Sequence, residues 1–328
     1  MIITRTPFRV SFAGGGSDMP SFYEQYGGCV LSTTITKYMY IMIHPYFEAN
    51  QTLLKYSETE LVDRVEDIRH SIFRQVLSDL DVHGVEITST ADVPSGTGLG
   101  SSSTFTVGLL NTLYCYKGKY VSKGALAEMA CEVEIGKLKS PIGKQDQYAA
   151  AFGGLKFYRF NPNGNVTVEP VIMKGETFHQ LERNLIMFYT GSTRSANTIL
   201  AQQKKNIGEA AKAANLVKMC ELAEQMRKSL SHNDISAFGS MLHEGWMLKK
   251  ELASGISNPV IDEAYDCAMR NGALGGKLLG AGGGGFLLFY CPEERQTALR
   301  EKIGLQQFDF RFEQDGTSVV YIGDKYWD

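Results

Sequence analysis

The sequence predicts an α+β protein in two parts, a strand-rich first half and a second half that mixes helices with antiparallel strands. Alternating and β-branched segments dominate up to residue 180, whereas long helical patterns dominate the region that follows. The 328 residues are enough for one large or two ordinary domains. We therefore expect two domains, at residues 1–180 and 181–328.

Three segments of the first half alternate or are rich in Ile, Thr and Tyr, and we expect strands there. They are residues 2–12, residues 29–45 (one or two strands) and residues 84–90. Apolar residues at helical spacing predict a helix over residues 61–80, with Ser57 or Thr59 as its cap. A second helix should begin at Ser122 and end near residue 136.

A hairpin and the elements of the second half complete the expected order. The hairpin joins residues 155–160 to 166–171 through a Pro-Asn-Gly-Asn turn. Expected helices are residues 196–230, with Gly208 a weak point, then 235–252 and 259–270. Expected strands are residues 184–190, 286–290, 308–312 and 319–322.

Composition argues against several classes of partner. The net charge of −3 and a pI near 6.1 give no support for binding nucleic acid or an anionic membrane. Arg5 and Arg9 interrupt any signal-peptide core, and no apolar run approaches a membrane span. The six cysteines are scattered without a C-x-x-C pair, as is typical of reduced thiols. We expect a cytoplasmic protein.

Residues 92–104, DVPSGTGLGSSST, are the most informative segment. Alternating glycines lead through three serines into an apolar run, which predicts a flexible loop that feeds the first turn of a helix. Such a loop offers backbone N–H donors and the positive end of a helix dipole to an anion, most often phosphate. An ordinary Gly/Ser loop with a serine cap is the alternative, but the ordered string Pro94-x-x-x-Gly98-Leu99-Gly100-Ser101-Ser102 is more specific.

That string resembles the nucleotide-binding motif of the GHMP kinases, which phosphorylate galactose, homoserine, mevalonate and related small molecules. It is not a Walker A loop, because no G-x-x-x-x-G-K-[ST] occurs. The resemblance implies the two-domain GHMP kinase fold, with a strand-rich N-terminal domain, a ferredoxin-like C-terminal domain and the active site in the cleft between them. It also implies ATP and Mg²⁺ as cofactors. The expected ATP-binding residues are Pro94, Gly96, Gly98, Leu99, Gly100, Ser101, Ser102 and Ser103.

The resemblance gives Ser102 and Glu134 as metal partners, and Mg²⁺ favours oxygen ligands. Glu134 stands seven residues before Pro141, the spacing at which mevalonate kinases place their metal glutamate. Glu132 lies two residues away and should point to another side of the helix. A solvated glutamate on an amphipathic helix is the alternative for Glu134.

Asp146 and Arg9 are the expected catalytic residues. The string Gly143-Lys-Gln-Asp146-Gln147 resembles the G-x-x-D-Q element of galactokinases, whose aspartate is the proposed base. Thr6-Pro-Phe-Arg9 resembles the family's A-P-x-[RK] start, where the cation lies close to that aspartate. An arginine there favours the charged aspartate and stabilises charge on the moving phosphoryl group. A polar-loop aspartate and an edge-strand ion pair are the alternatives.

Two loops indicate the substrate. Ala13-Gly-Gly15-Gly16-Ser17-Asp18 occupies the place of the galactokinase G-E-H-T-D sugar loop, but it lacks the Glu-His pair and is similar to the heptose-phosphate kinases. The segment at residues 190–196, which contains Arg194, is similar to the same group. We expect Gly15, Gly16, Ser17, Asp18 and Arg194 to bind the substrate.

The third family motif is the glycine run at residues 280–285, which includes Gly282 and Gly283. Its spelling satisfies G-x-G-x-x-G, but a strand follows it where a dinucleotide site needs a helix. An NAD-linked oxidoreductase is therefore rejected. The run resembles the family's C-terminal glycine loop, which should close over the active site and contact substrate.

The expected function is an ATP-dependent sugar kinase that acts on the anomeric hydroxyl of D-glycero-D-manno-heptose 7-phosphate. The 1,7-bisphosphate would serve nucleotide-activated heptose and surface glycan synthesis. Alternatives are an L-fucose or galactose kinase, or a galactokinase-like sugar sensor without turnover. The expected partner is a small sugar or sugar phosphate, and the chain should be a monomer or homodimer. Lys144, Lys174, Arg194 and Lys277 are unranked candidates for holding a substrate phosphate.

Overall fold

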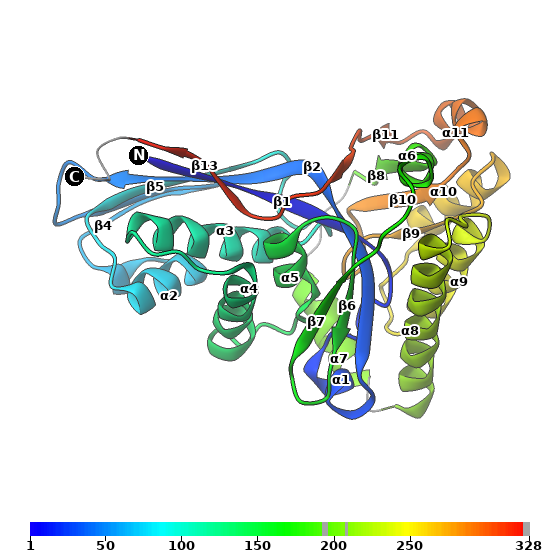
Figure 1. Ribbon diagram of the computed structural model, residues 1–328, viewed down its shortest axis with the longest axis horizontal. Coiled ribbons are helices and arrows are strands. Elements are labelled where there is room, and N and C mark those ends of the chain that lie inside the picture. The colour runs from blue at the N-terminus through cyan, green and yellow to red at the C-terminus, as the bar shows by residue number, and fades with distance from the viewer. Residues whose placement is uncertain (192–195, 207–208, 324–328) are drawn as a thin grey trace.

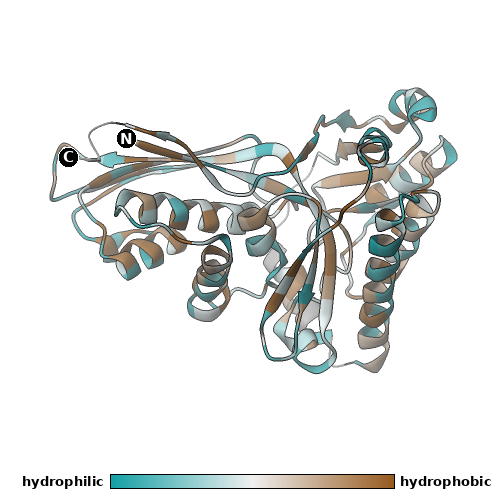
Figure 2. Cartoon of the chain, viewed as in Figure 1, coloured by the Kyte–Doolittle hydropathy of each residue, from teal (hydrophilic) through white to brown (hydrophobic). Residues whose placement is uncertain are grey.

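The computed structural model describes residues 1–191, 196–206 and 209–323, and it confirms the mixed α+β fold. Figure 1 shows a large sheet with helices α2 to α5 against one face, and a smaller sheet next to the helices α8 to α10. Figure 2 shows hydrophobic residues concentrated along the strands of both sheets. The two sheets therefore provide the core of two adjoining layered units.

The large sheet is built around one long strand, β2. Its strand order within the described residues is β13-β1-β2-β5-β3-β4, with β12 and the β6–β7 hairpin also joined to β2. The strands are β1 (Ile2–Ala13), β2 (Gly28–Pro45), β3 (Thr52–Lys55), β4 (Thr59–Val62), β5 (Val85–Ala91), β6 (Lys156–Phe160), β7 (Val166–Pro170), β12 (Phe312–Glu313) and β13 (Ser318–Ile322). The first half of β2 is buried on both faces and its second half alternates, so its hydrophobic pattern changes along the strand.

Helix α3 (Ser101–Tyr116) lies against the middle of the large sheet and contacts β1 and β2. It is apolar on most sides because α4 and α5 cover it as well. The other elements of this unit are α1 (Pro20–Tyr26), η1 (Val65–Asp67), α2 (Ser71–Leu80), α4 (Lys123–Cys131), a π-helical turn at Glu132–Lys137 and α5 (Gln145–Phe152). Ser122 caps α4 as predicted, since its hydroxyl accepts the Ala125 amide hydrogen.

The smaller sheet is antiparallel, in the order β11-β8-β10-β9 within the described residues. Its strands are β8 (Leu185–Tyr189), β9 (Gly275–Leu278), β10 (Phe286–Tyr290) and β11 (Gln306–Gln307). The accompanying helices are α6 (Gly175–Arg183), α7 (Ala196–Asn206), α8 (Ala210–Ser231), α9 (Phe238–Lys250), α10 (Pro259–Arg270), η3 (Glu293–Arg295) and α11 (Gln296–Ile303). Helix α9 packs on β9, which brings the end of α9 close to the glycine loop after that strand.

Two sequence expectations are wrong in their extent. The helix expected over residues 61–80 begins only at Ser71, because β4 and η1 occupy the earlier part. The Glu60 carboxylate accepts the backbone N–H groups of Arg69 and His70 and thereby holds a turn there. Likewise, the strand expected over residues 308–312 is replaced by the short β12.

Residues 312–322 return to the large sheet, where β12 pairs with β2 and β13 pairs with β1. The division of the chain near residue 180 stays a prediction, and any such division leaves these last strands with the first unit. No helix among the described residues is long and apolar enough to cross a membrane.

Candidate active site

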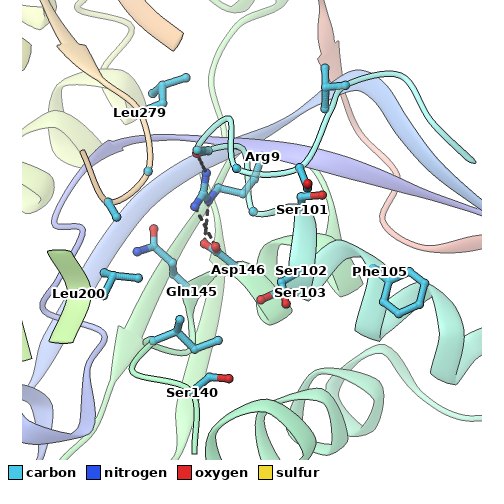
Figure 3. Close-up of a pocket in the computed structure, with 18 of the residues that line it drawn as sticks. Arg9, Ser101, Ser102, Ser103, Phe105, Ser140, Gln145, Asp146, Leu200 and Leu279 are labelled. Atoms are coloured by element: carbon cyan, nitrogen blue, oxygen red, sulfur yellow. Dashed lines mark hydrogen bonds and ion pairs between the residues drawn. The ribbon is translucent and has the colours of Figure 1, made fainter. Parts of the chain in front are cut away.

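A cavity of about 900 Å³ lies where the two units meet. The first unit contributes residues of the sugar loop (13–18), of the phosphate loop (94–100) and of the start of α5, which carries Asp146. The second unit contributes Leu200, Lys249 and residues of the glycine run (280–285). Figure 3 shows Ser101, Asp146 and Gln145 from the first unit facing Leu200 and Leu279 from the second. The cavity therefore has the position that a cleft between two domains would have.

The predicted phosphate loop ends at an open helix N-terminus on this cavity. Gly100 precedes α3 with φ of +81°, and no side chain caps the helix there. The first-turn N–H groups are thus left without a side-chain acceptor, and Ser101, Ser102 and Ser103 all line the cavity. This arrangement suits an anion such as a nucleotide phosphate.

Arg9 and Asp146 form a two-pronged ion pair beside that helix start. Arg9 Nε lies 2.7 Å from Asp146 Oδ1, and Arg9 Nη2 lies 2.8 Å from Oδ2 (Figure 3). A third donor, Nη1, bonds the Gly98 carbonyl at 2.5 Å. Arg9 is 5% exposed, whereas the Asp146 side chain is 22% exposed, and both line the cavity. Buried arginine forks of this kind fix a carboxylate in place.

The two glycine-rich loops touch through their backbones. A Cβ on Gly280 would lie 2.4 Å from Gly98 Cα, and a Cβ on Gly98 would lie 2.5 Å from the Leu279 carbonyl oxygen. Both glycines have positive φ, at +72° and +83°. Only glycine meets both conditions, so the second-unit loop packs directly on the phosphate loop.

Ser102 lines the cavity, whereas Glu134 does not and lies buried behind it. The Ser102 hydroxyl donates to Glu134 Oε1 at 2.5 Å, and the Gln147 side-chain amide donates to Oε2 at 2.7 Å. Glu134 is 1% exposed, and this burial raises its pKa to about 7, against the opposing effect of these hydrogen bonds. The π-helical turn turns Glu134 inward while Glu132 stays exposed.

Asp18 is buried in the sugar loop at the cavity edge. Its carboxylate accepts the Gly16 N–H at 2.9 Å, the Gln145 backbone N–H at 3.1 Å and the Gln145 side-chain amide at 3.0 Å. Burial, and then the neighbouring Asp146, raises the pKa of Asp18. Asp18 therefore joins the sugar loop to the first turn of α5, which carries Asp146.

Several predicted residues are not in the cavity wall. Leu99 points into the core, and its carbonyl accepts the Arg9 amide. Ser17 is buried behind the sugar loop, where it bonds Gly14 and Cys29. Gly283 is not part of the wall either, although Gly282 and Gly284 are. Arg194 lies outside the described residues.

The cations considered for a substrate phosphate do not line the cavity where the structure describes them. Lys144 donates to the Gly164 carbonyl at 2.8 Å, and Lys277 is buried and donates to the Phe12 carbonyl at 3.1 Å. Lys174 lies exposed at the start of α6. Lys249 does line the cavity, but it stands in helix α9 without a motif, so it could not be predicted from the sequence. Gln145 was missed too, although it adjoins Asp146.

Comparison with known proteins shows the family. Residues 65–154 match the family described as GHMP kinases N terminal domain, and residues 226–308 match GHMP kinases C terminal. D-glycero-alpha-D-manno-heptose 7-phosphate kinase of Campylobacter jejuni subsp. jejuni serotype O:2 is 31% identical, with 96% of this chain and 97% of that protein covered. The chain belongs to the GHMP kinases. As a GHMP kinase it is an ATP-dependent phosphotransferase with an alcohol group as acceptor.

This GHMP kinase is also similar to two other proteins. A solved D-glycero-D-manno-heptose 1-phosphate kinase from Bacteroides thetaiotaomicron superposes with a TM-score of 0.80 at 26% identity, covering 99% of this chain and 100% of the other. The bifunctional fucokinase/GDP-fucose pyrophosphorylase of Arabidopsis thaliana is 27% identical over 90% of this chain, which spans 30% of that protein.

Proposed function

We propose that this GHMP kinase transfers the γ-phosphoryl group of ATP to the anomeric hydroxyl of D-glycero-D-manno-heptose 7-phosphate. The observation that carries the proposal is the Arg9–Asp146 pair, which lies on the cavity between the open start of α3 and the sugar loop. The two heptose-phosphate kinases among the relatives support a phosphorylated heptose as acceptor. The 1,7-bisphosphate would then supply nucleotide-activated heptose for surface glycans.

Different residues of the site bind ATP, position the acceptor and take its proton. The phosphate loop and the first turn of α3 hold the ATP phosphates, while the sugar loop positions the acceptor. Asp146 accepts the hydroxyl proton as the sugar oxygen attacks phosphorus, and ADP leaves with the electron pair of the broken P–O bond. Arg9 keeps the Asp146 carboxylate in its orientation and compensates its charge.

Ser102 and Glu134 fit a magnesium partner. Their oxygens are adjacent, one lines the cavity, and Mg²⁺ prefers one or two carboxylates together with substrate phosphates. When bound, Mg²⁺ would neutralise charge on the ATP phosphates. The role of these two residues is to hold the ion at the helix start, and Gln147 fixes the second oxygen of Glu134.

An ADP-release assay over a panel of acceptors tests the proposal. The panel contains heptose 7-phosphate, the same heptose without phosphate, L-fucose and galactose, each with ATP and Mg²⁺. We expect the highest kcat/KM for heptose 7-phosphate. Equal or better turnover of an unphosphorylated sugar would favour the fucose or galactose kinase, and sugar binding without ADP release would favour a sensor.

A further inference from the structure

Lys249 is a buried cation at the cavity that no sequence motif marks. It lies near the end of α9 and is 5% exposed, yet it contributes to the cavity wall. Among the described residues of that wall, Arg9 and Lys249 are the lysines and arginines. Arg9 is already engaged by Asp146, so Lys249 is the cation with charge to spare for a ligand.

The Lys249 ammonium is held where the two glycine loops meet. It donates a hydrogen bond to the Gly280 carbonyl, and Gly280 packs on Gly98, whose own carbonyl accepts Arg9. An ammonium has three donors, so two remain for a ligand after the Gly280 bond. Gly280 and Gly98 therefore link Lys249 to Arg9, the partner of Asp146.

The surroundings of Lys249 leave its charge incompletely balanced. Within the described part of the chain, no carboxylate oxygen lies within salt-bridge distance of its ammonium. The charged groups that face it are Arg9 of β1, Asp18, Asp146 of α5 and Lys277 of β9. Burial, and then Arg9, lowers the pKa of Lys249 to about 8, against the opposing effect of the two aspartates. A buried ammonium without a paired anion is costly, and an entering anion would relieve that cost.

We propose that Lys249 binds the γ-phosphoryl group of ATP and stabilises it during transfer. The bond between the γ-phosphorus and the β,γ-bridging oxygen breaks and its electron pair leaves with ADP, while a bond to the acceptor oxygen forms and Asp146 takes the proton. Lys249 stays protonated throughout and offers its free N–H donors to the phosphoryl oxygens. The proposal rests on the phosphoryl transfer at this site and is independent of which sugar accepts the group.

Nucleotide binding without any sugar tests this role. Titration calorimetry with Mg²⁺ compares ADP with a non-hydrolysable ATP analogue for wild type and for Lys249→Met, which removes the charge at similar volume. We expect the variant to lose roughly tenfold to a hundredfold in affinity for the analogue, the range for a hydrogen bond to a charged group, and little for ADP. Lys250→Met is the matched control, because Lys250 pairs with Asp262 outside the cavity and should leave both affinities unchanged.

Lys249→Arg gives a second reading if the methionine variant does not fold. The arginine variant should keep most of the preference for the analogue. In wild type, kcat/KM for ATP should begin to fall near pH 8, the pKa of Lys249. In the arginine variant, this fall should occur at a higher pH. If Lys249 had only a structural role, the fall of kcat/KM would stay at the same pH in the arginine variant. Equal losses for ADP and the analogue, no loss for either, or a loss confined to the sugar phosphate would each overturn the proposal. Since the titration contains no sugar, failure of the heptose assignment would leave its outcome intact.

Discussion

Among single residues, Asp146 is held by Arg9 in one orientation. Both of its oxygens accept hydrogen bonds from Arg9, and the side chain still reaches the cavity. Each carboxylate oxygen has a further lone pair, so Asp146 can accept a hydroxyl proton without leaving Arg9. The aspartate is thereby fixed in orientation for one acceptor oxygen.

Asp146→Asn should abolish turnover while nucleotide binding stays close to wild type. The amide cannot accept the proton as a carboxylate does, and loss of a general base typically costs ~10²–10⁴ in rate. Steady-state kinetics and calorimetry with ATP measure the two effects, and sugar affinity is measured to exclude a misplaced acceptor. Turnover within a few-fold of wild type would reject the role. Asp63→Asn, at an exposed position, is the control.

The residue scale also shows what the sequence could reveal. Arg9, Ser102 and Asp146 stand in ordered motifs, so their approach to one cavity was predictable. Lys249 has no motif, and its place depends on how α9 packs on β9, a contact between distant segments. The side-chain direction of Ser17 could not be predicted from the sequence either, because Ser17 turns away from the cavity to bond Cys29.

Among the secondary-structure elements, the π-helical turn after α4 buries Glu134 beside Ser102 and leaves Glu132 exposed. Glu134→Gln should raise the Mg²⁺ concentration needed for half-maximal rate and lower kcat, since a neutral amide is a poorer ligand for a hard cation. Glu132→Gln should change neither, because Glu132 is exposed on the same turn. Magnesium titrations of activity provide the measurement. Sensitivity at Glu132 with none at Glu134 would refute this assignment.

The contact between the glycine loops gives a second prediction at this scale. Gly280→Ala should raise the KM for ATP and lower stability by about 1–3 kcal/mol, because its Cβ would strike the Gly98 backbone and its φ is positive. Gly304→Ala is matched for positive φ at +66° but has nothing within 4 Å of the new Cβ. It should carry only the backbone strain, with unchanged KM. Thermal melts and ATP kinetics separate the two effects, and equal KM values would contradict the docking of the loops.

Element boundaries were harder to predict than element types. Apolar residues at positions 61, 65 and 68 fit the spacing of the helix that follows, yet they belong to β4, η1 and the turn before α2. The cause is the buried Glu60 carboxylate, whose bonds to Arg69 and His70 depend on tertiary structure. By contrast, the strand at Phe286–Tyr290 and the helix at Pro259–Arg270 were predicted with their bounds, since proline and apolar runs mark them locally.

In the whole molecule, the proposed reaction places two anionic ligands in the cleft together. ATP and a sugar phosphate repel each other, and the chain itself has a net charge of −3. Arg9 and Lys249 are the cavity lysines and arginines among the described residues, and each is contributed by a different unit. Both cations already stand on the cavity wall, where they would offset part of that repulsion.

The position of the new phosphate on the sugar distinguishes anomeric transfer from every other reaction of this site. Wild-type enzyme is incubated with heptose 7-phosphate, ATP and Mg²⁺, and the product is analysed by phosphorus and proton NMR. We predict a second sugar phosphate whose phosphorus signal is split by the anomeric proton, formed by wild type and absent with Asp146→Asn. A phosphate on any other carbon, or no transfer to this sugar while an unphosphorylated sugar is turned over, would rule out anomeric phosphorylation of heptose 7-phosphate.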